Sequence, residues 1–180
     1  MIWFTSDTHF CHNKEFVYLS RGYATVEDMN KSIVEKWNAK IQDGDIVYHL
    51  GDVIMSDIDA GMEYLKQLKG EIRIIRGNHD TDKKVAAYET LPNIQVLGWG
   101  EMIKYKKRMI FMSHFPSMTT IDDGKKGRQK IIGLYGHTHQ EDPYNENPYL
   151  YNVGMDAHAN EPISIDEVLE RIGKKWTSRD

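Results

Sequence analysis

The chain has 180 residues, of which 40% are hydrophobic and 28% are charged, and its formal net charge is −4. This length suits one domain with a full core, so we expect a single domain over residues 1–180. No run approaches the ~20 apolar residues that a membrane span requires, no signal peptide is recognised, and one cysteine, Cys11, excludes an internal disulfide. We therefore expect a cytoplasmic protein, and the acidic charge argues against a partner such as long nucleic acid.

The first half of the chain alternates predicted strands with predicted helices. Short apolar runs rich in β-formers predict strands, and apolar residues at steps of three or four predict helices. Thr25 and Asp28 form a capping box for the first helix, and Gly70 is expected to cap the second at its C-terminal end. In chain order the elements are a strand over 1–6, a helix over 25–42, a strand over 45–50, a helix over 57–69 and a strand over 71–76.

Strands follow one another more closely in the second half. A weak helix after Asp82 precedes a strand, a hairpin, a long loop, two further strands and a last helix that starts at a capping box of Ser164 and Glu167. The ranges are 94–97 for the strand, 101–105 and 108–113 for the hairpin, 115–130 for the loop, and 130–135 and 149–154 for the later strands. The whole pattern predicts a layered α/β sandwich with a mixed sheet or two packed sheets.

Five of the predicted strands end directly before side chains that can bind a metal. Since the carboxyl ends of parallel strands in open α/β sheets share one crevice, these side chains are expected to converge. Glycines stand before three of them and allow a sharp turn or a close approach of the backbone. The seven candidate ligands are Asp7, His9, Asp52, Asn78, His114, His137 and His139.

The types of ligand indicate the kind of ion. Imidazole nitrogens with carboxylate and amide oxygens, and no thiolate, suit Mn, Fe, Zn, Ni or Co better than a calcium cage or a cysteine-bound zinc. Any one of these short motifs alone is more often a turn or a polar pair, but five together favour metal binding. Seven ligands are too many for one ion, whereas two divalent ions bridged by Asp52 account for all of them.

These five blocks also carry a resemblance to a known family. The runs "DTH", "GD", "GNHD", "H" and "GHTH", in this order, resemble the signature of the calcineurin-like metallophosphoesterase superfamily, and "FTSDTHFCH", "VYHLGD" and "YNVGMDAHANEPISIDE" resemble a small bacterial and phage branch of it. The resemblance implies an α/β (α+β) fold, a four-layer αββα sandwich of two mixed β-sheets flanked by helices. It also implies one ion on Asp7, His9, Asp52 and His139, and a second on Asp52, Asn78, His114 and His137.

The function that follows is hydrolysis of a phosphoester by two metal ions, with Mn preferred and Fe, Zn, Ni or Co as alternatives. A hydroxide bridging the ions is expected to attack phosphorus in a small phosphodiester, a nucleotide or a phosphomonoester. His79 is the predicted proton donor to the leaving alkoxide, and its neighbour Asp80 is predicted to hold it protonated.

Further side chains are weaker candidates, each with a solvated or structural role as its alternative. His12, Arg21 and Asn78 are predicted to contact the substrate, and His158 is a weaker candidate for the same role. His49 is expected to pack in its strand or to support Asp52. The basic cluster in the long loop suggests a lid over an anionic substrate and consists of Lys125, Lys126, Arg128 and Lys130.

Two other functions remain open. A nuclease of the same superfamily would usually add a DNA-binding or capping domain, for which this length leaves no room. A non-catalytic metal-binding scaffold would tend to lose ligands or the proton donor, and here all are present. We expect a small phosphorylated substrate and no membrane as partners, and the oligomeric state stays open because each tryptophan could lie in the core or in an interface.

Overall fold

The computed structural model describes residues 1–117 and 131–177, with side chains described as far as Lys174. The predicted elements are present in the predicted order, and three short ones were not anticipated: α1, η1 and β9. The elements are β1 (Ile2–Thr5), α1 (Glu15–Tyr18), α2 (Val26–Lys40), β2 (Ile46–His49), α3 (Ile58–Leu65), β3 (Glu71–Ile75), α4 (Asp82–Tyr88), β4 (Ile94–Gly98), β5 (Gly100–Tyr105), β6 (Arg108–Ser113), β7 (Ile131–Tyr135), β8 (Leu150–Asn152), the 3₁₀ helix η1 (Met155–His158), β9 (Ile163–Ser164) and α5 (Ile165–Thr177).

The strands form two sheets, and both are mixed. The first has the order β4-β3-β2-β1-β9, in which β1 to β4 are parallel and β9 pairs antiparallel with β1. The second has the order β5-β6-β7-β8, in which β5 and β6 form the predicted antiparallel hairpin and β6, β7 and β8 are parallel. This arrangement of two mixed sheets with flanking helices confirms the fold class that the sequence predicted.

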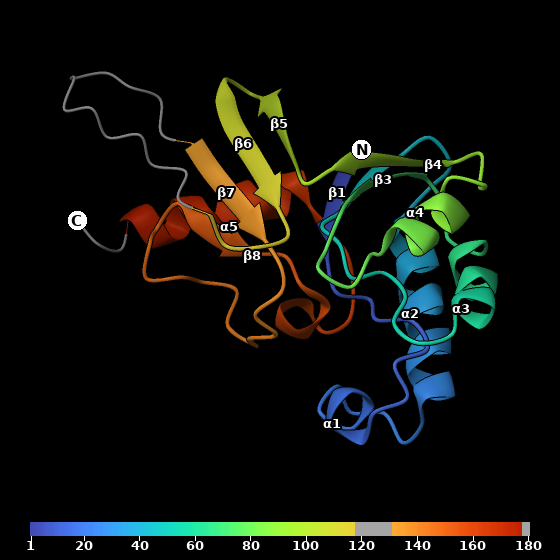
Figure 1. Cartoon of the computed structure of the whole chain (residues 1–180). Helices are drawn as coiled ribbons and strands as arrows, with labels where there is room; N and C mark the ends of the chain where they lie inside the picture. Colours follow the sequence, from blue (N-terminus) through green and yellow to red (C-terminus); the bar gives the residue numbers. More distant parts are fainter. Residues whose placement is uncertain (118–130, 178–180) are drawn as a thin grey trace.

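Side chains along β1 and β2 point alternately into two hydrophobic cores, one on each face of the first sheet. Trp3 and Val47 face one core, which the helices α2, α3 and α4 cover on one side of the first sheet (Figure 1). Phe4 and Tyr48 face the other core, to which strands of both sheets and α5 contribute. Successive side chains of a strand point to opposite faces, so a four-residue strand is enough to join both cores.

Helix ends follow the predicted capping chemistry, with one difference. The Thr25 side chain accepts a hydrogen bond from Asp28 N at 3.1 Å, and Ser164 and Glu167 bond reciprocally as a capping box. The second helix, α3, ends at Leu65 and not at residue 69. Its last turn tightens, because the amides of Gln67 and Leu68 bond to the carbonyls three residues before them, and Gly70 lies beyond the helix with φ +87°.

In the part of the chain that the structure describes, no helix is both long and apolar enough to cross a membrane.

The tryptophans and the predicted basic loop differ in where they lie. Trp37 is fully buried, whereas Trp99 is exposed and lies against the Arg76 guanidinium. The predicted basic lid of Lys125, Lys126, Arg128 and Lys130 lies outside the described residues.

Backbone hydrogen bonds extend past the strand ends and bring the predicted ligands together. Asp7 N bonds to Gly51 O at 3.0 Å, and His9 N bonds to Asp52 O at 3.1 Å, which ties the loops after β1 and β2. Gly136 N bonds to His114 O at 3.0 Å, which ties the loops after β6 and β7. An isolated bridge between Ser6 and Gly154 links the two sheets beside these loops.

Candidate metal centre

The predicted ligands form two groups at the carboxyl ends of the strands. Within each group one nitrogen or oxygen atom per residue lies within 4.8 Å of the others. The first group joins the loops after β1 and β7, and the second joins the loops after β2, β6 and β7. The groups are Asp7, His9 and His139, and Asp52, His114 and His137.

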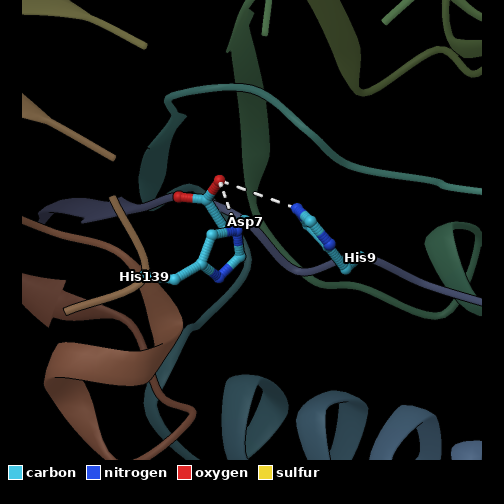
Figure 2. Close-up of side chains that lie close together, drawn as sticks. All are labelled: Asp7, His9 and His139. Atoms are coloured by element: carbon cyan, nitrogen blue, oxygen red, sulfur yellow. Dashed lines mark ion pairs between the residues drawn. The ribbon is translucent and has the colours of Figure 1, made fainter. Parts of the chain in front are cut away.

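The Asp7 carboxylate is held by backbone on one side and faces the first group on the other. Its Oδ2 accepts a hydrogen bond from His137 N at 2.9 Å. Its Oδ1 lies 3.7 Å from His9 Nε2 and 3.8 Å from His139 Nε2, so both rings converge on one oxygen (Figure 2). These spacings are too long for hydrogen bonds and leave room for an ion among the three atoms.

Asp52 lies between the two groups. Its Oδ1 accepts a hydrogen bond from His79 N at 2.9 Å. Its Oδ2 lies 3.6 Å from His9 Nε2 in the first group and 3.4 Å from His114 Nε2 in the second. One carboxylate oxygen therefore faces both candidate positions.

Three of the histidines are oriented through their Nδ1 atoms. His114 Nδ1 lies 2.7 Å from Leu50 O, His9 Nδ1 lies 2.9 Å from His12 Nδ1, and His139 Nδ1 lies 2.9 Å from Asp156 Oδ2. Each contact leaves the Nε2 atom of the ligand facing the carboxylates. Metal-binding histidines in proteins are commonly oriented in this way.

His137 of the second group and the predicted ligand Asn78 approach His114 from different loops. His137 Nδ1 lies 3.2 Å from His114 Nε2, so this ring presents its Nδ1 atom to the centre. Asn78 Oδ1 lies 2.9 Å from the same His114 nitrogen. The amide oxygen and the two ring nitrogens thus meet at one point beside Asp52.

Several ligands have a backbone conformation that is rare for residues with a side chain. Positive φ angles of 51° to 67° occur at Asp7, His9, Asp52, His137 and His139. Each such residue costs of order 1 kcal/mol, and such strain concentrates at functional sites. These left-handed turns lie in the short loops that bring Asp7 with His9, and His137 with His139, to the centre.

Glycines give the carboxylates room. A Cβ atom on Gly77 would lie 2.5 Å from Asp52 N and closer still to Oδ1 of the same residue. A Cβ on Gly136 would overlap Oδ2 of Asp7 and the Ser6 side chain. These two glycines are thus required by close packing against the carboxylates.

Charges in the centre are strongly coupled. Burial disfavours ionised Asp52, but the nearby imidazoles of His114 and His9 and the hydrogen bond from His79 N hold the pKa of its carboxyl well below the usual value. The pKa of Asp7 is likewise lowered, with burial outweighed by His9 and the other nearby histidines. Burial opposes the charged imidazole of His9 and of His114, yet the facing carboxylates raise the pKa of both. Binding of a cation would have to release these protons.

The donor set fits divalent metal ions. Asp7 Oδ1 and His9 Nε2 are buried and have no hydrogen-bond partner among residues 1–117 and 131–177. Buried polar atoms without a partner are costly, and a cation between them would satisfy both. Nitrogen and oxygen donors without thiolate suit Mn²⁺, Fe²⁺, Co²⁺, Ni²⁺ and Zn²⁺. The ligation of each residue by an ion remains a prediction.

The His79 side chain is partly exposed, whereas its neighbour Asp80 is buried. The His79 side chain is 47% exposed, and its Nε2 lies 3.9 Å from Asp52 Oδ2, at the open side of the centre. The predicted contact of Asp80 with His79 is not observed. Instead the buried Asp80 carboxylate accepts hydrogen bonds from Asp52 N at 2.8 Å, Gly77 N at 2.9 Å, Val53 N at 3.2 Å and Tyr88 Oη at 2.9 Å. It organises the backbone of two ligand loops.

Arg21, which was predicted to contact the substrate, makes its contacts within the protein. The guanidinium is buried, with 1% of the side chain exposed, and bonds to both oxygens of Asp156 at 2.9 Å. It also donates to Asp7 O at 2.7 Å and Thr8 O at 3.1 Å. With its donors used inside the protein, Arg21 is a structural link.

Asp156 itself was not predicted. It follows "NVGM" at the end of β8, so a carboxylate after a strand and a glycine was the available signal. Its role depends on contacts with Arg21 and His139, which lie far away in the chain.

The remaining histidines have supporting contacts. Burial and the neighbouring His9 charge lower the pKa of His12 to about 4, so its ring is neutral and does not supply charge for a phosphate. His49 bonds to Thr8 Oγ1 at 2.9 Å and stacks on Trp37, so it packs in its strand. His158 Nε2 lies 2.8 Å from Asn152 O and its ring lies against Tyr151, which does not support a contact with substrate.

Fold and centre together define a class of protein: two mixed sheets with flanking helices that carry, at shared strand ends, clustered histidines and carboxylates able to hold divalent metals. The chain belongs to the calcineurin-like phosphoesterase superfamily, since the family model described as "Calcineurin-like phosphoesterase superfamily domain" matches residues 1–161. This finding confirms the resemblance in the sequence.

Individual relatives are similar over nearly their whole length. An uncharacterised protein of Methanocaldococcus jannaschii is 34% identical over 96% of this chain and 92% of its own. The Gene 66 protein of Mycobacterium phage D29 is 28% identical over 95% of both chains.

Two solved structures share the fold. A protein of unknown function from Aquifex aeolicus has a TM-score of 0.71 at 24% identity, with 94% of this chain and 98% of that one covered. A structure described as a novel archaeal phosphodiesterase has a TM-score of 0.51 at 17% identity, over 85% of this chain and 81% of that one.

Proposed function

We propose that this protein is a metal-dependent phosphoesterase that hydrolyses a small phosphodiester or nucleotide, with a phosphomonoester as the alternative substrate. Membership in the superfamily supports the reaction class. The single observation that carries the proposal is the position of Asp52 Oδ2, 3.6 Å from His9 Nε2 and 3.4 Å from His114 Nε2. A carboxylate oxygen between two clusters of nitrogen and oxygen donors is suited to a pair of ions.

Two divalent ions, Mn²⁺ foremost, would neutralise charge on the phosphate oxygens and lower the pKa of a coordinated water. One ion would be held by Asp7, His9, Asp52 and His139, and the other by Asp52, Asn78, His114 and His137. The chain itself fixes the two carboxylates through the amides of His137 and His79. This prior ordering limits the reorganisation needed during the reaction.

His79 is the proposed general acid. Its amide is anchored to Asp52 Oδ1, whereas its ring is half exposed at the open side of the centre and can reach a bound ester. It would donate a proton to the departing alkoxide oxygen. Asp80 does not take part in this role, because its carboxylate binds the amides of the two ligand loops and the Tyr88 hydroxyl.

Two exposed aromatic rings beside the centre support a substrate with a planar organic group. Phe115 is 43% exposed and its ring centroid lies 4.7 Å from that of His137. Phe16 is 73% exposed and packs edge-on against His12 at 5.9 Å. Exposed aromatic faces can stack on a nucleobase or an aryl group.

The first experiment measures hydrolysis of an aryl phosphodiester and of the matching monoester by metal-stripped protein, with and without added Mn²⁺. Asp52→Asn serves as the control. Turnover that requires Mn²⁺ and disappears in the control is the expected result, with the diester as the faster substrate. Absence of turnover on both esters despite two bound ions would contradict the proposed activity and favour a metal-binding scaffold.

His79 is tested by changing the leaving group. His79→Ala should slow hydrolysis of an alkyl ester about 100-fold or more and an aryl ester far less, because only the poor leaving group needs protonation. Equal losses on both esters would show that His79 does not act as the acid.

A further inference from the structure

A buried ion pair between Arg21 and Asp156 contacts His139, a member of the first group of candidate ligands. The Asp156 carboxylate accepts Arg21 Nε on Oδ1 and Arg21 Nη2 on Oδ2, both at 2.9 Å. The same Oδ2 accepts a hydrogen bond from His139 Nδ1 at 2.9 Å. Arg21 also binds the carbonyls of Asp7 and Thr8, in the loop that carries two other ligands. A single guanidinium therefore joins η1 to the loop after β1.

Asp156 determines which nitrogen of His139 is available. Its two oxygens form a bidentate ion pair with the buried Arg21 guanidinium, which favours the ionised carboxylate. An ionised carboxylate only accepts hydrogen bonds, so His139 must donate its Nδ1 proton. The lone pair then lies on Nε2, which faces Asp7 Oδ1 at 3.8 Å.

His139 needs this support more than the other ligands of its group. Its side chain is 38% exposed, whereas those of His9 and Asp7 are 4% and 1% exposed. Packing alone therefore does not restrict the ring. The bidentate arginine contact fixes the carboxylate in a plane, and the carboxylate fixes the ring.

The second group has no equivalent among the described residues. His114 is backed by the neutral carbonyl of Leu50, and His137 presents its Nδ1 atom directly to the centre. A carboxylate partner makes an imidazole more basic and a better ligand than a carbonyl partner does. The two candidate positions therefore differ in the chemistry behind their histidines.

We propose that Asp156, held in place by Arg21, is a positioning residue for His139 and strengthens metal binding selectively at the position formed by Asp7, His9 and His139. The inference rests on the proposed function only through its metal ions and does not require the phosphoesterase reaction.

The test separates the two positions before it removes Asp156. His114→Ala leaves the first position as the main site for Mn²⁺, and His9→Ala leaves the second. Asp156→Asn is then added to each, and the dissociation constant of Mn²⁺ is measured by calorimetry on the full-length, metal-stripped proteins. Asn keeps the size of the side chain and removes its charge. We expect Asp156→Asn to weaken Mn²⁺ binding about 10-fold to 100-fold in the His114→Ala background and less than twofold in the His9→Ala background.

Two further variants distinguish positioning from general effects. Glu141→Gln removes an exposed negative charge that lines the same cleft as Asp156 and Arg21, and it should leave both constants unchanged. Arg21→Lys keeps the positive charge but cannot bind the carboxylate through two nitrogens. It should weaken the first position about threefold to tenfold, which is less than Asp156→Asn.

A visible spectrum of bound Co²⁺ gives a second readout. Because His139 would be a ligand, Asp156→Asn should alter the spectrum in the His114→Ala background and not in the His9→Ala background. Circular dichroism of the metal-free variants checks folding, and Arg21→Lys serves as the test if Asp156→Asn does not fold.

Four results would overturn the inference. Equal weakening in both backgrounds, or a change of less than twofold in the His114→Ala background, would show that Asp156 does not act through His139. If Glu141→Gln weakens Mn²⁺ binding as much as Asp156→Asn does, the effect would come from the loss of any nearby negative charge and not from the contact with His139. A wild type that binds no Mn²⁺ overturns the proposed function as well, whereas a wild type with two ions and no effect of Asp156→Asn overturns this inference alone.

Discussion

The amide of His137 donates a 2.9 Å hydrogen bond to Oδ2 of Asp7, across 130 positions of the chain and between the two sheets. We predict that Asp7→Asn loses one of two bound Mn²⁺ ions and at least about 100-fold of the turnover, because an amide lacks the charge and opposes either His137 N–H or the ion. Metal titration and rate measurement check this, with exposed Asp43→Asn as the control. Retention of both ions at full rate would contradict the assignment.

Gly77→Ala should abolish the centre although it adds only a methyl group. The new Cβ would lie 2.5 Å from Asp52 N, where the loops after β2 and β3 touch, and neither backbone can retreat. Gly173→Ala is the matched control, since a Cβ there meets nothing within 4 Å and the site lies within α5. We expect the control to gain up to about 1 kcal/mol in the free energy of unfolding. Normal metal binding by Gly77→Ala would refute the packing argument.

Asp80→Asn distinguishes a structural role from an orienting role. Its carboxylate accepts three backbone amides and the Tyr88 hydroxyl, so an amide group in its place would oppose at least one donor. We predict a loss of more than about 3 kcal/mol in the free energy of unfolding of the metal-free protein. The exposed Asp82→Asn, which breaks an ion pair with Arg76, should cost less than about 1 kcal/mol.

Urea titrations of both variants check this comparison. If Asp80→Asn keeps its stability and loses turnover only on alkyl esters, whose leaving group needs a proton, Asp80 would instead orient His79.

His49 should make the protein sensitive to acid. Burial lowers the pKa of its imidazole from 6.5 to about 4, despite the opposing charge of Asp80. The unfolded chain therefore takes up this proton at higher pH than the folded protein does. The stabilisation is complete above about pH 6.5 and is lost as the pH falls towards 4.

The variant His49→Gln lacks this titration. Between pH 7.5 and 5.0 the metal-free wild type should lose roughly 2 kcal/mol more of its unfolding free energy than the variant does. Urea unfolding at the two pH values measures the difference. Parallel losses in both proteins would show that His49 does not titrate in this range.

Much of the fold and of the ligand set could be predicted because both depend on local patterns. Apolar runs such as the one that ends at Ser6 identify strands, and the topology of parallel strands brings the residues after them together. Capping boxes at Thr25 and Ser164 likewise depend on neighbours three positions away. The end of α3 was wrong by four residues because several turn conformations satisfy the same sequence.

The supporting residues could not be predicted, because their partners are distant in the chain. Arg21 and Asp156 are 135 positions apart, and a solvated arginine looks the same in the sequence as one buried against a carboxylate. Asp80 lies beside His79 in sequence, yet a side chain one position away points in another direction. β9 has two residues and carries no pattern of its own.

The ligands come from the loops after β1, β2 and β3 in one sheet and after β6 and β7 in the other, from Asp7 to His139. Ions bound among them would act as reversible cross-links between the halves of the molecule. A cross-link across so long a stretch removes much of the freedom of the unfolded chain, as a disulfide would, and Cys11 has no other cysteine with which to form one. Resistance to unfolding would then depend on the supply of metal. A chelator would lower the stability of the loops that join the two sheets before it affected either core.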